Sequence, residues 1–587
     1  MNGRYLRSAI LTGLVAGVAM IYLVLVGIVG VFAERNVITG YLTLGRMMLL
    51  IPALVAGYRI ASGDGPFTRR VGSAVLVGAA AGLLFAGFLL AAVALSPDIR
   101  DVFNRLSQKT LDYLTFTELG LGSTAGSALY VVLGLVMALI GGLVRITPPR
   151  TRRALIGGFA AVVLMTMLEQ FLRPRLLDFG WHDFENWLYT SHGLTPVSAA
   201  VVFLVGSLGA LFWPDARAKT RTQLAAASPS TRKAVRWAAL LVVILFVYTL
   251  PIIAGSFMTQ VLVLVGFYIL LGLGLNIVVG YAGLLDLGYV AFYAVGAYFT
   301  ALLTSPTSAL GWGLSFWIAL PIVIGLSAGV GLLIGAPVLR LRGDYLAIVT
   351  LGFGEIARVL LGSDALKPWL GGPTGILSVP SMIDMDPIRD GSQYTLPIVG
   401  EVSGPLATYY PLIGFCLLAA FVAYRLKYSR TGRAWNAMRE DEDVAQATGV
   451  SIVNYKLLAF AMGAAVGCVG GAIYATHLLS VVPGGFTLIV SITVLAVVVL
   501  GGMGSIPGVV VGALALIGLP ELLREFAEYR LLVYGAVLVL VMILRPEGLV
   551  PDAQRRAELQ ESHGPDPEPI DRPRGVAGDP LAGEVVG

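Results

Sequence analysis

Charged side chains are scarce in this sequence. Asp, Glu, Lys and Arg make up 13% of its 587 residues, whereas soluble proteins carry about 25%. Together with 57% hydrophobic residues, this scarcity excludes an ordinary soluble fold and predicts a protein that crosses the membrane many times. Cysteine is scarce too, since only Cys416 and Cys468 occur, both within apolar runs. The sequence therefore has no disulfide framework and no cysteine-based metal site.

Signatures of enzymes are also missing. The dipeptide Gly-Lys does not occur, so the sequence lacks the phosphate-binding loop of many ATPases. None of the four histidines shares a predicted helix face with a nucleophile, which disfavours an intramembrane enzyme and predicts no catalytic residue. His182, Asp183 and Glu185 are close enough in the chain to suggest a metal site. The aromatic residues around them favour a loop at the membrane surface instead, so we predict no metal. The net charge of +5 reflects arginines in loops, so we predict no nucleic-acid partner.

Long apolar runs replace the missing charge. Runs of about 17 to 25 residues predict transmembrane helices, and their continuous rather than alternating pattern disfavours a β-barrel. We therefore predict an all-α polytopic membrane protein with about 16 transmembrane helices. Residues 486–523 fit either two full spans or two half-helices. The predicted spans are 8–31, 42–58, 71–95, 124–144, 154–172, 196–213, 237–254, 257–280, 284–303, 316–339, 344–361, 407–424, 456–477, 486–500, 507–523 and 531–544.

The distribution of basic residues predicts the orientation. Lys and Arg gather in alternate loops, including 145–153, 217–236 and 425–439, whereas loops 304–315 and 478–485 contain none. Because basic loops stay in the cytoplasm, we predict cytoplasmic N- and C-termini and a location in the plasma membrane of a prokaryote. The first run resembles a signal peptide at Val31-Phe32-Ala33, but its apolar stretch of about 23 residues exceeds the usual length.

Composition divides the chain into four parts. Residues 1–213 form a predicted six-helix membrane extension, and 214–236 form a basic cytoplasmic linker. Residues 237–550 form a second hydrophobic block of about ten spans. The tail 551–587 is rich in proline, glycine and acidic residues, so it is predicted to be a disordered cytoplasmic segment.

Two spans carry residues that are costly in lipid. Glu355 and Arg358 are three residues apart, so they share a helix face. Glu355 follows Asp344 by roughly 16 Å of helix, which predicts a buried ion pair near the middle of the membrane. The pair fits helix packing or a place on the translocation path, and both interpretations remain open.

Residues 272–298 contain the second set of costly residues. Asn276 and Asp286 interrupt an apolar stretch, and Gly280 and Gly283 favour a break between them. A broken helix exposes backbone dipoles, as in many transporter substrate sites. Asn276, Asp286, Glu355 and Arg358 are therefore candidates for the translocation path. A plain hairpin with a capping aspartate is the alternative.

Glycines four residues apart recur in the second block and allow helices to cross closely. They are packing signals, to which we assign no chemistry. The pairs are Gly325 with Gly329, Gly331 with Gly335, Gly463 with Gly467, Gly467 with Gly471, and Gly508 with Gly512.

One polar stretch, "RTGRAWNAMREDEDVAQATGV" at 430–450, stands apart from its oily surroundings. Asp441 or Asp443 can cap a short helix, and Gly449 suits the position after its end. Ala445 and Ala447 are small, so another surface could approach them closely. A cytoplasmic helix of this kind fits either a docking element for a partner or a solvated connector.

This stretch resembles the coupling segment of ABC-importer permeases, whose pattern is E-A-A-x-x-x-G. Here the pattern reads Asp443-Val444-Ala445-Gln446-Ala447-Thr448-Gly449. Asp replaces Glu, Val replaces the first Ala, and the later Leu-Pro of the pattern is missing. Further motifs in order, among them "GLNIVVGYAGLLDLGYVAFYAVGAY", "LRLRGDYLAIVTLGFGEIARVLL" and "VLGGMGSIPG", resemble LivM-type permeases of branched-chain amino acid importers over about 266–551.

The resemblance implies a function and a set of partners. The chain would be the permease subunit of an ABC importer for leucine, isoleucine, valine or related small amino acids or amides. It would pair with a homologous LivH-type permease. Two ATPase subunits would dock from the cytoplasm, one of them on the coupling helix with Asp443, Ala445, Ala447 and Gly449. A binding protein outside would deliver substrate, touching the loop 362–406. The chain itself would bind no cofactor, because ATP and Mg²⁺ are used by the ATPases.

Two other functions fit parts of the sequence. An ion-coupled secondary transporter of small hydrophobic amino acids would use Asp286, Glu355 and Arg358 to couple protons or sodium. Transport by this chain alone, driven by an ion gradient, would favour that alternative. The extension before the linker fits no family, and it is either a scaffold for the permease or a separate sensor or lipid-facing module.

Overall fold

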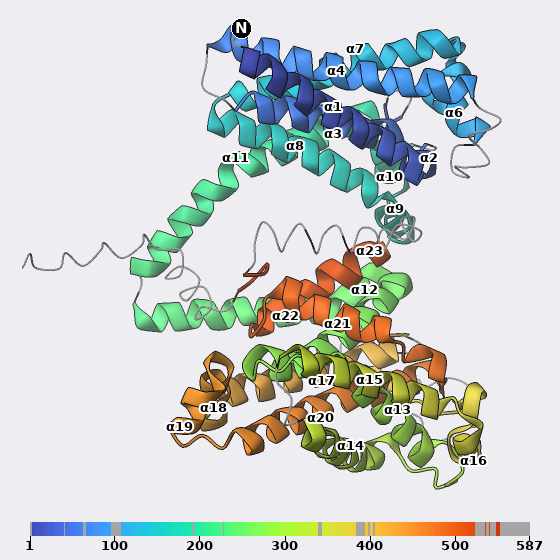
Figure 1. Cartoon of the computed structure of the whole chain (residues 1–587), viewed down its shortest axis with the longest axis vertical. Coiled ribbons are helices and arrows are strands. Elements are labelled where there is room, and N and C mark those ends of the chain that lie inside the picture. The colour runs from blue at the N-terminus through green and yellow to red at the C-terminus, as the bar shows by residue number, and fades with distance from the viewer. Residues whose placement is uncertain are drawn as a thin grey trace, which may run out of the picture. The chain divides into compact units, whose positions relative to one another are not determined.

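The computed structural model divides the chain into two compact units, Met1–Leu250 and Pro251–Gly587 (Figure 1). Each unit is described by itself. The residues that the structure describes are 3–33, 35–39, 42–62, 66–95, 107–190, 193–226, 228–338, 343–382, 394–396, 400–402, 405–522, 535, 539 and 547–551.

The first unit is a bundle of apolar helices. In it α4 packs along both α1 and α7, and α3 packs against α7 (Figure 1). Phe85 and Tyr130 lie at its centre with ring centroids 4.9 Å apart. Its helices are α1 (Gly3–Val26), α2 (Ile28–Val31), α3 (Leu44–Ile60), α4 (Phe67–Ala94), α6 (Gln108–Leu114), η1 (Thr117–Leu119), α7 (Ser123–Ile146), α8 (Pro149–Met167), α9 (Glu169–Asp178), α10 (His182–Leu188) and α11 (Pro196–Ala226).

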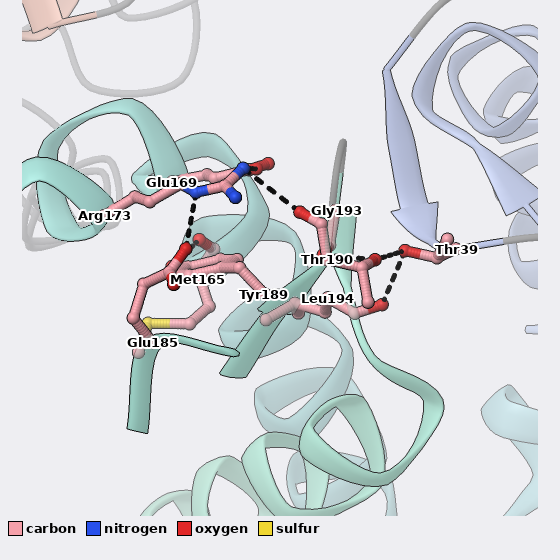
Figure 2. A network of polar contacts seen from close by, with 9 residues as sticks. All are labelled: Thr39, Met165, Glu169, Arg173, Glu185, Tyr189, Thr190, Gly193 and Leu194. Atoms are coloured by element: carbon pink, nitrogen blue, oxygen red, sulfur yellow. Dashed lines mark hydrogen bonds and ion pairs between the residues drawn. The ribbon is translucent and has the colours of Figure 1, made fainter. Parts of the chain in front are cut away.

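A small four-stranded sheet joins distant loops of this unit. Its order is β2-β1-β4-β3, and Ile38 of β1 lies opposite Leu194 of β4 in a parallel pair. A hydrogen bond between the Thr39 and Thr190 hydroxyls also connects these loops (Figure 2). The strands are β1 (Asn36–Ile38), β2 (Leu42–Thr43), β3 (Tyr189–Thr190) and β4 (Gly193–Leu194).

A buried charge network holds α9 and α10 beside this sheet. Arg173 Nε lies 2.6 Å from Glu185 Oε1, and Arg173 Nη1 lies 3.7 Å from Glu169 Oε1. The same guanidinium donates to the Thr190 carbonyl at 3.2 Å (Figure 2). Glu185 is therefore the partner of an arginine. Among the described residues no group of three His, Cys, Asp or Glu could hold a metal ion, and His192 lies outside them.

The second unit is also helical, with two π-helical segments that interrupt its helices. Its elements are α12 (Pro229–Leu275, which begins in the first unit), η2 (Asn276–Tyr281, π), α13 (Val290–Thr304), α14 (Phe316–Val338), α15 (Asp344–Leu361), η3 (Asp364–Leu366), α16 (Lys367–Leu370), η4 (Gly372–Thr374), α17 (Pro405–Lys427), α18 (Arg430–Glu440), α19 (Glu442–Ala447), α20 (Ile452–Leu478), η5 (Pro483–Gly485), α21 (Leu488–Gly501), α22 (Ile506–Ala513), η6 (Leu514–Gly518, π) and α23 (Leu519–Leu522).

Short strands pair between these helices. β5 (Ile376–Leu377) pairs antiparallel with β8 (Ser480–Val481), and β6 (Tyr394–Leu396) pairs antiparallel with β7 (Gly400–Val402). These two-stranded pairs lie in connections between helices, so the predicted all-α class is confirmed.

Helix α20 is the core of the second unit, because α13 and α14 both pack along it. Its glycines allow this contact, since a Cβ at Gly471 would lie 2.0 Å from the Tyr293 carbonyl oxygen. The predicted close crossings at Gly463, Gly467 and Gly471 are confirmed. The prediction for Gly325 and Gly329 is wrong within this chain, because an added Cβ there meets nothing within 4 Å.

The number of long spans is lower than the predicted sixteen. Among the described residues, nine helices are long and apolar enough to cross a membrane, or up to eleven if each bent pair is one span. The bent pairs are α8 with α9, at 65°, and α15 with α16, at 59°. Six of the predicted runs account for the difference. Runs 42–58, 284–303 and 507–523 form shorter helices, runs 237–254 and 257–280 merge into α12 across Gly255, and run 531–544 lies almost entirely outside the described residues.

The parts predicted from composition remain predictions. Where the structure describes it, the predicted linker 214–236 is helical and lies on α11 and α12. The predicted disordered tail lies outside the described residues apart from Pro551.

Candidate functional site

The polar stretch at 430–450 folds into two short helices, α18 and α19. The Ser429 hydroxyl begins α18 by accepting from the Gly432 N–H at 3.2 Å. Trp435 fixes α18 to the rest of the unit, because it is fully buried and its Nε1 donates to the Tyr455 carbonyl at 2.8 Å. The stretch is therefore an anchored element of the second unit rather than a loose connector.

Both ends of α19 use the predicted residues. Asp441 is the N-cap, and its Oδ1 accepts from the Asp443 and Val444 N–H groups at 2.8 and 2.9 Å. After the last turn Gly449 adopts φ +91°, a conformation that glycine reaches without strain. Its N–H donates to the Gln446 carbonyl, and the Val450 N–H donates to the Ala445 carbonyl, the two bonds of a Schellman ending.

The faces of α19 differ from the prediction at one residue. Ala445 is only 2% exposed, so it packs within this chain instead of facing a partner. Asp443, Ala447 and Gly449 are exposed, and Val444 is 60% exposed. Lys456 Nζ of α20 lies 2.6 Å from Glu442 Oε1 and holds the inner face in place. The exposed face, from Asp443 and Val444 to Ala447 and Gly449, is what the helix offers to another molecule.

The break predicted near Gly280 is present. Helix α12 passes into the π-helical turn η2 at Asn276, and residues 282–289 are irregular before α13 begins at Val290. Gly283 has φ +71°, which the turn requires. A π-helical turn and an irregular segment connect the two helices, which fits both a broken helix and a hairpin with a capping aspartate.

Asn276 and Asp286 are both buried at this break. Asn276 Oδ1 accepts from the Gly504 N–H at 2.8 Å, and Asp286 Oδ1 accepts from the Gly288 N–H at 2.9 Å. Asn276 Nδ2 and Asp286 Oδ2 have no hydrogen-bond partner among the described residues. Unsatisfied polar atoms in an apolar interior are costly, which favours a functional reason for both residues.

The Glu355–Arg358 pair forms but is not buried. Arg358 Nε donates to Glu355 Oε1 at 3.0 Å, and the two side chains are 38% and 44% exposed. The prediction of burial is wrong because α15 packs through its other face, where Leu346, Ala347 and Thr350 are buried. No described hydrogen bond or ion pair joins this pair to Asn276 or Asp286, so the four candidates do not form one polar cluster.

Two basic residues that the sequence did not single out reach the break. Arg439 Nη1, in the last turn of α18, donates to the Gly280 carbonyl at 2.8 Å. Lys427 Nζ, at the end of α17, donates to the Gly504 carbonyl at 2.9 Å. In the sequence, residues 430–450 stood out for their polar character, and Gly280 and Gly283 stood out for a predicted helix break. No sequence pattern links residues 159 positions apart, and only the fold brings them together.

Comparison with known proteins identifies the family. Residues 257–542 match the family described as branched-chain amino acid transport system / permease component. The high-affinity branched-chain amino acid permease LivM of Salmonella typhimurium is 40% identical over 418 residues, which cover 69% of this chain and 94% of that protein. The chain belongs to this permease family. LivM of Escherichia coli K12 is 44% identical over 303 residues, 50% of this chain and 70% of that protein.

A paralogous permease is also similar. LivH of Salmonella typhimurium is 24% identical over 289 residues, which cover 48% of this chain and 91% of that protein. No solved structure matches the chain.

The similarity to LivM extends further towards the N-terminus than the motifs indicated. Residues 237–587 are 351 of the 587 residues, or about 60% of the chain, yet the Salmonella match covers 69% of it. Part of the block before residue 237 therefore also resembles LivM. The rest of the extension before the linker remains unassigned.

Proposed function

We propose that the chain is the translocating permease of an ABC importer for branched-chain amino acids. One observation carries the ATP-driven part: α18 and α19 form an anchored, polar element whose outer face is free of packing within the unit, at Val444 and Ala447. One of two ATPase subunits would dock there, and the two would supply the energy, with ATP and Mg²⁺ bound by them. The permease itself would bind no cofactor.

The other partners and the orientation belong to the same proposal. A LivH-type permease would complete the membrane pathway, as the relatives named LivM and LivH suggest. A binding protein outside would deliver leucine, isoleucine, valine or a related small amino acid. The arginine-rich loops would face the cytoplasm with both termini, in a prokaryotic plasma membrane. Asn276 and Asp286 are the best candidates for substrate contact, because each has an unsatisfied polar atom at a helix break.

The test is a single charge placed on the exposed face of α19. Val444→Arg is expected to abolish both co-purification with the ATPase subunits and ATP-dependent uptake in liposomes, because a bulky cation there prevents close docking. Val444→Thr keeps the shape of the side chain and is the matched control, with wild-type uptake expected. Ala445→Arg is unsuitable, since it would force a cation into the interior.

The outcomes separate the rival functions. Wild-type assembly and uptake in Val444→Arg would remove α19 as the docking element. Uptake by the purified chain alone, driven by a proton or sodium gradient without ATP, would overturn the importer and establish an ion-coupled transporter.

A further inference from the structure

Three segments of the second unit meet at one polar contact, which we call the Arg439 junction. It consists of Arg439 and Lys427 with Asn276, Gly280 and Gly504. Arg439 holds the Gly280 carbonyl, Lys427 holds the Gly504 carbonyl, and Asn276 accepts from the Gly504 N–H, each at 2.8 to 2.9 Å. The junction links α17 and α18 to the broken helix η2 and to the turn between α21 and α22.

The break in the helix explains why a cation is needed here. The last carbonyls of a helix have no partner within it, and they carry partial negative charge. Gly280 lies in the final turn of η2, one residue before its end at Tyr281. The guanidinium of Arg439 therefore satisfies a carbonyl that the break leaves open. A hydrogen bond from a charged donor is stronger than one between neutral groups.

Glycine is required for the close approach of the three segments. A Cβ at Gly280 would lie 2.1 Å from Asn276 Oδ1 and 2.7 Å from the Gly504 nitrogen. A Cβ at Gly283 would lie 2.7 Å from Cγ of Arg439. Gly504 has φ +81°, a backbone conformation that other residues rarely adopt. The junction therefore depends on close packing of the three backbone segments and is not an incidental contact between surface side chains.

The junction also lies between the two parts of the proposed function. Arg439 stands two residues before Asp441, the cap of α19, and that helix carries the proposed docking face. On the other side, η2 leads directly into the irregular segment with Asp286. A displacement of α19 therefore acts through Arg439 on the helix break where substrate contact is proposed.

We propose that the Arg439 junction transmits movement of α18 and α19 to the broken helix, so that Arg439 is a positioning residue for transport. This inference rests on the proposed ATP-driven function. Transmission requires one element that both ends bias. The junction is the candidate for this element, because its side chain-to-backbone bonds tie the docking helices to the break.

The experiment compares uptake with ATP hydrolysis in the complete complex. Arg439→Ala is expected to bind the ATPases normally and to keep their hydrolysis, while uptake per ATP falls about tenfold with the loss of the charged hydrogen bond. Arg439→Lys keeps a cation and is expected to restore part of the coupling. Arg425→Ala removes an exposed cation from the end of α17 and is expected to leave uptake unchanged.

Two further measurements make the result specific to transmission. A cysteine at half-buried Met503, beside Gly504, is expected to change its maleimide labelling rate when nucleotide locks the wild-type ATPases, and to lose that response with Arg439→Ala. The native cysteines are buried and give little background. In a double-mutant cycle, Arg439→Ala and Lys427→Ala are expected to lower uptake non-additively, since both side chains hold backbone carbonyls of the same junction.

Each outcome bears on one proposal. If the wild-type complex shows no ATP-dependent uptake, the importer function fails. If wild type transports and Arg439→Ala keeps both its uptake per ATP and its nucleotide-dependent labelling, the junction does not transmit. Equal loss of ATPase binding and uptake in Arg439→Ala would also overturn the proposal, because it would give the residue a role in docking or folding alone.

Discussion

Both units pair buried charge with charge, in the second unit through Lys456 and Glu442, but their other charged contacts differ. In the first unit Arg173 meets the carboxylates of Glu169 and Glu185, so charge is matched by charge. In the second unit Arg439 and Lys427 meet backbone carbonyls at a helix break and a glycine turn. The first arrangement closes loops onto a bundle. The second satisfies a backbone that has been opened, and an opened backbone is what a transport site requires.

The helices of the two units also differ in length and in continuity. In the first unit α4 and α7 run for 28 and 24 residues, and a Cβ at Gly78 of α4 would lie 2.5 Å from the Gly134 carbonyl oxygen of α7. In the second unit the helix before Asp286 ends in a π-turn, and α13 has only 15 residues. Both units use glycine to bring helices together, and both interrupt a helix at a left-handed glycine, Gly27 in the first unit and Gly283 in the second. The difference is that the break in the second unit also holds buried polar residues, and three substitutions test the comparison.

The largest effect is expected from a glycine that packs helices in the second unit. Gly471→Val would force side-chain atoms onto the Tyr293 carbonyl oxygen, which a Cβ would already approach to 2.0 Å. Because two backbones must separate, we expect a loss of about 3 kcal/mol or more of stability. Thermal unfolding of the purified protein in detergent measures it.

Gly325→Val is the matched control for that substitution. Gly325 lies in α14, and an added Cβ there meets nothing within 4 Å. A wild-type unfolding temperature is expected. Equal destabilisation by both substitutions would show that valine disturbs these helices generally, and that crossing at Gly471 is not special.

Local rules predicted much of the second unit and none of its long-range contacts. The break near Gly280, the cap at Asp441 and the turn at Gly449 follow from the chemistry of neighbouring residues, so the sequence was sufficient for them. The exposure of Glu355 and the burial of Ala445 depend on which face a helix turns towards its neighbours. Small size is compatible with either side, and for that reason the prediction for Ala445 was wrong.

The Arg439 junction also shows that neighbouring residues in the sequence do not predict long-range contacts. Arg439 stood in a stretch noted for its polar residues, and Gly504 stood in "VLGGMGSIPG", which was noted only for its resemblance to LivM-type permeases. Their meeting depends on how α18 packs against η2, and that packing involves residues far apart in the chain. A cation predicted near the end of a broken helix would have been the usable signal, because open carbonyls attract positive charge.

An intermediate effect is expected from the charge network of the first unit (Figure 2). Arg173→Ala leaves Glu185 buried without its arginine. Breaking a buried pair by removing one partner costs about 3 to 5 kcal/mol, and we expect about 2 kcal/mol because Arg173 itself is partly exposed. Hydrogen exchange of residues 165–190 is expected to accelerate, whereas exchange in α20 stays at the wild-type rate.

Arg175→Ala is the control within the same helix. Arg175 pairs with Asp178 at 2.9 Å, and Asp178 is exposed. A surface pair contributes about 0 to 1 kcal/mol, so exchange is expected to change little. If Arg173→Ala and Arg175→Ala accelerate exchange equally, the buried network is not what holds α9 and α10 to the sheet.

The smallest effect is expected at the cap of α19. Asp441→Ala removes the carboxylate that accepts from the Asp443 and Val444 N–H groups, at a cost of about 1 kcal/mol. Hydrogen exchange of residues 442–447 is expected to accelerate, because six-residue α19 has few other bonds at its start. Asp441→Asn keeps an accepting oxygen and is expected to remain close to wild type.

Since Ala445 and Lys456 fix the inner face of α19 independently of the cap, Asp441→Ala should loosen its first turn without detaching it. Loss of the whole helix in Asp441→Ala would mean that the docking face depends on one aspartate, and that the second unit holds this element more weakly than the first unit holds α10.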